Sequence, residues 1–154
     1  MGMGLEEEDA FEALAADARL RLWRAFVAVR GVDGADEAVS EALAWAWEHR
    51  ERLISMVNPV GYLYRVGLTR TTPRAAALLP TPGEVGIPDV EPGLLPALLA
   101  LPESQRAAVW LVHGCGWTYA EVADALHIGR STVGTHTSRA MKTLRRQLEV
   151  TVHG

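Results

Sequence analysis

The chain has 154 residues, of which 49% are hydrophobic, so it is long enough to bury a core in one medium domain or two small helical ones. Its net charge of −4 argues against a protein that binds polyanions indiscriminately. The charge is uneven: residues 1–60 carry 12 acidic and 6 basic side chains, whereas residues 101–154 carry 4 acidic and 6 basic ones. We therefore expect any nucleic-acid contact surface in the C-terminal part.

The single cysteine, Cys115, excludes a disulfide within the chain and suits a reducing compartment. The N-terminus is acidic where a signal peptide would be basic and then apolar. No apolar run approaches the roughly 20 residues that span a bilayer. These features predict a cytoplasmic protein without membrane insertion.

Three helices are predicted in the first half, over residues 9–30, 35–50 and 59–70, because apolar side chains recur there at three- and four-residue steps. Gly31 and Gly34 separate the first two, and Pro59 suits the first position of the third. Residues 71–93 are rich in Pro and Gly, which predicts a linker between a domain over 1–70 and another over 94–154.

After the linker, helical patterns cover residues 94–100, 103–114, 118–126 and 130–148, and no alternating strand pattern is present. The predicted fold class is all-α. The last two segments form a helix-turn-helix pattern, TYAEVADALHIGRSTVGTHTSRAMKTLRR, over residues 118–146. Thr118 and Glu121 predict a capping box at the start of its first helix.

The second helix of this pattern is predicted to bury Val133, Ala140 and Leu144. Its exposed N-terminal face would read base edges, as recognition helices do. Basic side chains then follow and can neutralise phosphates. The predicted DNA-binding residues are Arg130, Ser131, Thr132, Gly134, Thr135, Ser138, Arg139 and Lys142, with Arg145 and Arg146 as further phosphate contacts.

The segment LPESQRAAVWLVHGCGWTYAEVADALHIGRSTVGTHTSRAMKTLRRQL, residues 101–148, resembles the sigma-four domain of extracytoplasmic-function sigma factors. Residues 35–53 are similar to that family's helix that grips the clamp of RNA polymerase, and residues 58–70 to its segment that captures the minus-ten promoter element. The resemblance implies polymerase binding by Glu37, Val39, Ser40, Glu41, Leu43 and Trp47. It implies minus-ten contacts by Asn58, Tyr62, Arg65 and Arg70.

Two departures from the family concern promoter opening and polymerase binding. Ser40 stands where the family usually has Gln, and Pro73 interrupts a helix that is normally longer and more basic. The sequence therefore predicts weak unaided promoter opening. The partners implied are core RNA polymerase, promoter DNA and, in some members, an anti-sigma factor.

No phosphate-binding loop, nucleophile elbow or paired carboxylates indicate an enzyme, and no catalytic residue, cofactor or metal is predicted. Tyr62 and Trp47 are candidates for stacking on unpaired bases. Two alternatives stay open. One is a self-standing regulator, since residues 131–136 also resemble a LuxR-type recognition helix; the other is an interaction protein that occupies polymerase or an anti-sigma factor without initiating.

Overall fold

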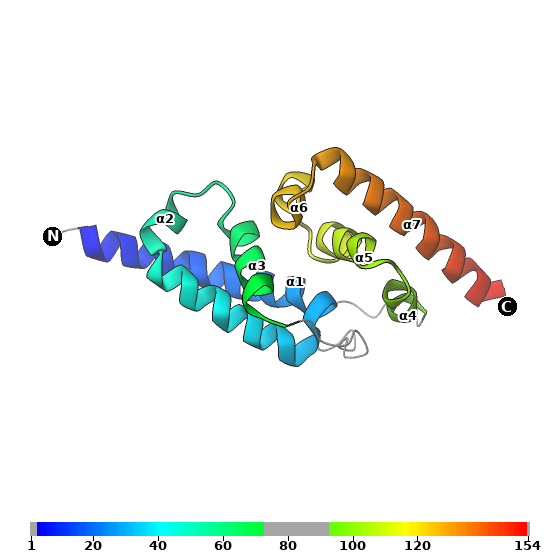
Figure 1. The fold of residues 1–154 in the computed structure, drawn as a ribbon, viewed down its shortest axis with the longest axis horizontal. Helices are drawn as coiled ribbons and strands as arrows, with labels where there is room; N and C mark the ends of the chain where they lie inside the picture. Colours follow the sequence, from blue (N-terminus) through cyan, green and yellow to red (C-terminus); the bar gives the residue numbers. More distant parts are fainter. Residues whose placement is uncertain (1–2, 73–92, 154) are drawn as a thin grey trace.

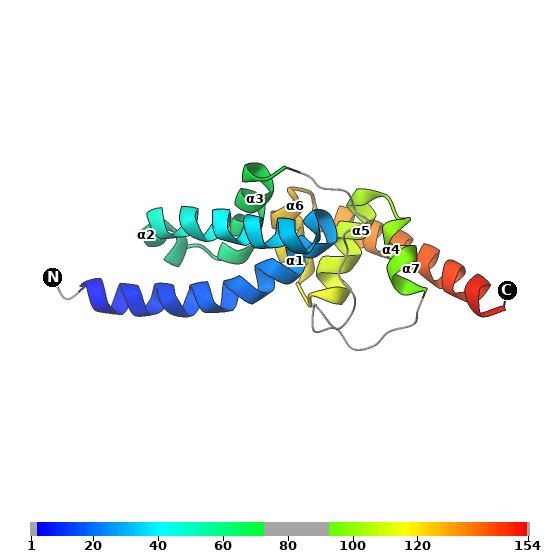
Figure 2. The ribbon, with the colours of Figure 1, turned by 90° about the horizontal axis from the view of Figure 1, so that it is seen from below.

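The computed structural model describes residues 3–72 and 93–153, and these form helices joined by short turns. Helix α1 (Met3–Glu48) reverses its direction at Gly31, whose φ of 74° and ψ of 179° are not helical and divide α1 into two stretches. Figure 2 shows the two stretches running antiparallel. Their pairing is confirmed by Trp23, which donates to Asp36, and by Phe11, whose ring meets that of Trp47.

The short helix α2 (Arg50–Ile54) follows, and α3 (Pro59–Arg70) then packs against α1 (Figure 1). Gly67 permits this close approach, since a Cβ there would collide with the ring of Phe26. The guanidinium of the buried Arg30 donates to the carbonyl of Leu68 and to the hydroxyl of Thr71. A cation at the C-terminal end of a helix is electrostatically favourable, so Arg30 anchors the end of α3 on α1.

The second half contains α4 (Leu94–Leu99), α5 (Glu103–Val109), a π-helical turn η3 (Trp110–Gly114), α6 (Tyr119–Leu126) and α7 (Arg130–His153). The turn η3 includes a bond of 2.9 Å from the amide of Cys115 to the carbonyl of Trp110. Gly116 follows with a φ of 72°, which lets the chain turn sharply into α6.

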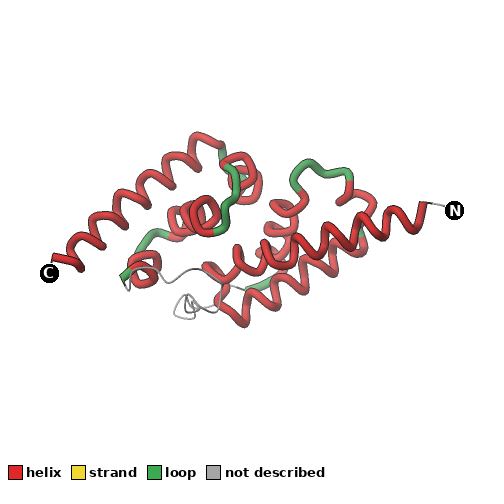
Figure 3. Tube along the Cα trace, turned by 180° about the vertical axis from the view of Figure 1, so that it is seen from behind, coloured by secondary structure: helices red, strands yellow, loops and turns green. Residues whose placement is uncertain are grey.

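The two halves share one continuous core in which α3 packs against α6 and α1 packs against α5 and η3 (Figures 1 and 3). Tyr64 lies at the centre, stacked on Phe26 at 5.1 Å and meeting the edge of Trp117 at 5.7 Å. Burial raises the pKa of the Tyr64 hydroxyl well above its ordinary value. The halves therefore meet through aromatic side chains that are almost wholly buried.

The all-α prediction is confirmed, since the described residues contain no strand. Several boundaries differ from those predicted. Helix α1 begins near residue 3 instead of residue 9, and α2 was not predicted. Helix α7 continues from the predicted end at residue 148 to His153, because no Pro or Gly lies between these positions. Gly34 lies within the helix, and most of the predicted linker 71–93 lies outside the described residues. None of the described helices is long and apolar enough to cross a membrane.

Candidate nucleic-acid interface

The helix-turn-helix is built from α6 and α7. The predicted capping box is present: the amide of Glu121 donates to the Thr118 hydroxyl at 3.1 Å, and the amide of Thr118 donates to the Glu121 carboxylate at 3.0 Å. Helix α6 ends at Leu126 and is capped by His127, which adopts the left-handed conformation with φ 59° and ψ 46°. The amide of Ile128 then donates a hydrogen bond of 2.9 Å to the carbonyl of Ala123, which makes the turn tight.

Helix α7 presents the face that the sequence predicts. Val133, Ala140 and Leu144 are buried against the rest of the C-terminal half. The exposed side chains include those predicted to contact DNA, namely Arg130, Ser131, Thr135, Ser138, Arg139 and Lys142, whereas Thr132 and Gly134 are partly buried. A Cβ at Gly134 would meet Tyr119 at an ordinary 3.5 Å, so packing does not require glycine there.

The predicted minus-ten residues lie on or just before α3. The Asn58 carboxamide oxygen accepts from the amide of Gly61 at 3.1 Å and thereby caps the helix. The ring of Tyr62 lies 5.0 Å from that of Trp45, with the guanidinium groups of Arg52 and Arg65 near its face. Such a cation-flanked aromatic ring is suited to stacking on a base and to holding its phosphate.

Arg70, the fourth predicted minus-ten residue, is exposed and lies 3.8 Å from the carboxylate of Glu41. This ion pair joins a predicted DNA contact to a predicted polymerase contact. Because both side chains are exposed, this ion pair contributes little stability. Arg70 and Glu41 can therefore leave it and contact another molecule instead.

The predicted polymerase surface lies on the second stretch of α1, and its residues differ in accessibility. Glu37 and Ser40 are exposed and Leu43 is partly buried. Trp47 is 51% exposed, with the Arg50 guanidinium 4.5 Å from its ring centre. Val39 is only 5% exposed and belongs to the core, so the expectation that its side chain lies on the exposed contact surface is corrected.

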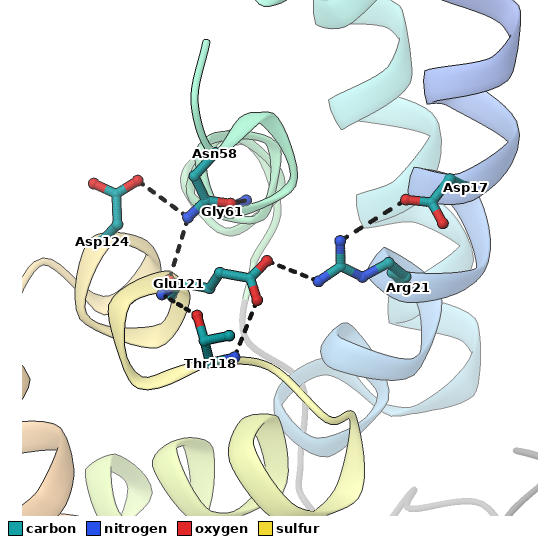
Figure 4. Close-up of polar contacts among 7 residues, drawn as sticks. All are labelled: Asp17, Arg21, Asn58, Gly61, Thr118, Glu121 and Asp124. Atoms are coloured by element: carbon teal, nitrogen blue, oxygen red, sulfur yellow. Dashed lines mark hydrogen bonds and ion pairs between the residues drawn. The ribbon is translucent and has the colours of Figure 1, made fainter.

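A polar cluster that the sequence did not predict joins the two halves (Figure 4). The guanidinium of Arg21 on α1 lies 2.9 Å from the carboxylate of Glu121, which also caps α6. Partial burial acts to raise the pKa of Glu121, but the bond from the Thr118 amide and the charge of Arg21 outweigh it and lower the pKa. Asn58 donates to the carboxylate of Asp124 at 3.2 Å.

An open groove of about 700 Å³ lies beside this cluster. It brings together the predicted minus-ten side chains Asn58 and Tyr62 and the first residue of the recognition helix, Arg130. The two predicted DNA-reading elements are thus neighbours in this structure. Sequence patterns carry no signal for this proximity, because Arg130 lies more than sixty positions after Asn58 and Tyr62 in the chain.

Comparison with known proteins agrees with this architecture. Residues 94–144 match the family model described as Sigma-70, region 4. The sigma factor RpoE from Bartonella quintana, solved with the anti-sigma factor NepR, is similar in structure with a TM-score of 0.64 and 21% identity. That match covers 94% of this chain and 95% of RpoE. CnrH, solved with the cytosolic domain of CnrY, gives a TM-score of 0.62 and 22% identity over 93% of this chain and 90% of CnrH. No curated protein matches the chain significantly.

The C-terminal segment is therefore a Sigma-70 region 4 domain, and the chain as a whole has the fold of a sigma factor. The region 4 match and the shared fold agree with the resemblance to extracytoplasmic-function sigma factors that the sequence shows.

Proposed function

We propose that this protein is a bacterial transcription initiation factor that binds core RNA polymerase and directs it to specific promoters. The observation that carries the proposal is the region 4 match at residues 94–144, on a helix-turn-helix whose recognition helix exposes Arg130, Ser131 and Thr135. Exposed polar residues at the start of a recognition helix are those that read base edges.

We assign three surfaces to this function. Helix α7 would read the minus-thirty-five element, with Arg130 as the best candidate for a bidentate contact to guanine. The start of α3 would contact the minus-ten element through Asn58 and Tyr62. The second stretch of α1 would bind polymerase, with Trp47 as its exposed aromatic anchor. Such a protein would work in the cytoplasm and would perform no catalysis itself.

An anti-sigma factor is a further proposed partner. RpoE, which shares this fold, was solved with the anti-sigma factor NepR. An anti-sigma factor would find both halves of this chain within reach of one binding surface, because α3 and α6 pack against each other.

The direct test is a pair of assays on the full chain. Binding to core RNA polymerase at low salt would separate a sigma factor from a self-standing regulator, which has no reason to bind polymerase. Transcription from a library of promoter fragments would then show whether bound polymerase initiates. Absence of polymerase binding would refute the proposal.

A second candidate, a sigma-like protein that occupies polymerase without initiating, is favoured by the short α3. This helix ends at Arg70, and Thr71 already has extended backbone. The helix therefore offers few basic side chains to hold a separated strand. Polymerase binding without transcription on negatively supercoiled, AT-rich templates would support this second candidate.

A further inference from the structure

A second cavity, of about 520 Å³, lies where α1, α3 and α5 meet the helix-turn-helix. Its volume falls within the range of about 300–1,000 Å³ in which proteins bind small organic molecules. Both halves of the chain supply its apolar wall, which consists of Val29, Leu68, Ala107, Leu126 and Ile128. It shares no lining residue with the groove beside Asn58, so it is a separate site.

Arg30 brings to this cavity a positive charge that no carboxylate of residues 3–72 and 93–153 pairs with at ion-pair distance. Its side chain is only 6% exposed. The guanidinium donates to the Thr71 hydroxyl and to the carbonyls of Val29 and Leu68, which are all uncharged. These bonds use three of the five N–H groups of a guanidinium and leave two. Since buried charges in proteins are normally paired, the arrangement favours an anionic ligand.

Tyr64 adds a buried hydrogen-bond donor to the same cavity. Its side chain is 1% exposed, and its hydroxyl makes no hydrogen bond with any residue that the structure describes. Burial raises the pKa of this hydroxyl well above its ordinary value, so it stays protonated and can donate. The ring nitrogen Nδ1 of His136 is also buried, and it too has no partner within the described part of the chain. Buried polar atoms of this kind gain free energy when a ligand supplies the missing hydrogen bond.

We propose that this cavity binds a small monocarboxylate with an apolar body. The carboxylate would accept from the two remaining N–H groups of Arg30 and from the Tyr64 hydroxyl. A guanidinium matches the geometry of a carboxylate, and hydrogen bonds between charged groups are the stronger ones. The apolar body would lie against Leu68, Leu126 and Ile128. This site goes beyond the proposed role in transcription and does not depend on it.

Glu103 limits the charge that the ligand can carry. This residue lines the same cavity and is exposed, so its carboxylate lies at the side that faces solvent. Its negative charge repels a second negative group on the ligand. The site therefore suits a monocarboxylate better than a dicarboxylate or a phosphate ester.

The test uses the full-length chain with benzoate, naphthoate and octanoate as probes. Benzyl alcohol, naphthyl methanol and octanol are their uncharged counterparts. Titration calorimetry gives the affinities, and thermal unfolding gives an independent readout, because a ligand that binds only the folded chain raises the Tm. Chemical-shift changes at the methyl groups of Leu68, Leu126 and Ile128 report whether the probe binds in this cavity.

Three substitutions separate the contributions of the polar groups. Tyr64→Phe removes one hydroxyl and keeps the aromatic ring, and it should weaken carboxylate binding roughly tenfold, as expected for a hydrogen bond to a charged group. Tyr119→Phe is the matched control, because Tyr119 is 43% exposed and lies outside the cavity. Glu103→Gln should tighten carboxylate binding by roughly 2- to 5-fold, because it removes the repulsion, and should leave the alcohols unaffected.

Carboxylates that bind more tightly than their alcohols, and that respond to these variants as described, would support the site. Equal affinities for each acid and its alcohol would overturn the pairing with Arg30. Equal affinities of Tyr64→Phe and Tyr119→Phe would overturn the role of the Tyr64 hydroxyl. Absence of binding by every probe at millimolar concentration would overturn the site itself. The polymerase-binding assay tests the proposed function separately, so none of these outcomes bears on it.

Discussion

The indole Nε1 of Trp110 donates a hydrogen bond of 2.7 Å to the backbone carbonyl of Arg24, which lies 86 positions earlier in the chain. The ring of Trp110 is 9% exposed and belongs to the core that both halves share. This bond fixes the π-helical turn η3 against α1, so that α6, which follows η3, meets α3 in a defined position.

We expect Trp110→Phe to lower the free energy of unfolding by about 0.5–1.5 kcal/mol, because the aromatic ring is largely retained while the hydrogen bond is lost. Chemical denaturation followed by circular dichroism measures the change. Trp47→Phe is the control, since Trp47 is half exposed and has no such bond to the other half. An equal loss in both variants would show that ring size, and not the bond to Arg24, sets the cost.

Gly67→Ala should destabilise the protein by about 1–3 kcal/mol, because its Cβ would collide with Phe26 and approach the carbonyl of Ala38 at 3.0 Å. The same substitution at Gly134 should instead stabilise the protein by about 0.5–1 kcal/mol, because alanine favours the helical conformation more than glycine does and its Cβ would meet no clash there. Thermal unfolding of the two variants compares them directly. Stabilisation by Gly67→Ala would mean that α3 can move away from α1 at little cost.

Trp47→Ala should weaken binding to core RNA polymerase by about tenfold or more, as expected when an aromatic anchor is truncated. Leu20→Ala is the matched control, because Leu20 is 53% exposed against 51% for Trp47 and lies on the other stretch of α1. Surface plasmon resonance with immobilised core enzyme gives both affinities. Similar small effects in the two variants would indicate that Trp47 is not part of the polymerase-binding surface.

Arg130→Ala should cost about 1–3 kcal/mol in binding to the preferred duplex and relax the preference at one base position. Arg145→Ala, on a later exposed turn of α7, should weaken binding to all sequences alike and reduce the salt slope by about 1. The measurement is selection from a randomised duplex pool, with affinities determined at several salt concentrations. Uniform weakening by Arg130→Ala would make Arg130 a phosphate contact.

The depressed pKa of Glu121 predicts a pH-dependent stability. A carboxyl whose pKa is lower in the folded chain than its ordinary 4.5 stabilises the fold above 4.5, and this contribution disappears as the pH falls through the folded value. Glu121→Gln should therefore be less stable than wild type at neutral pH, and the difference should shrink below 4.5. Urea unfolding across this range tests the expectation, which a constant difference would contradict.

Local rules were enough to predict most helices and the outward face of the recognition helix. A capping box such as that of Thr118 and Glu121 and the 3.6-residue period of α7 depend only on neighbours in the chain, so the sequence by itself determined them. The family resemblance could not separate Val39 from Trp47, although the side chain of Val39 is 5% exposed and that of Trp47 is 51% exposed.

Only the tertiary structure decided how the two halves meet. Nothing in the sequence pairs Arg21 with Glu121 or Asn58 with Asp124, since each pair is brought together by packing of Tyr64, Trp110 and Trp117 that has no period along the chain. Side-chain periodicity tells which face of a helix is buried, but not which helix covers it. For that reason the exposed face of α7, which we propose to read DNA, followed from the sequence, whereas the contact of Asn58 with α6 required the fold.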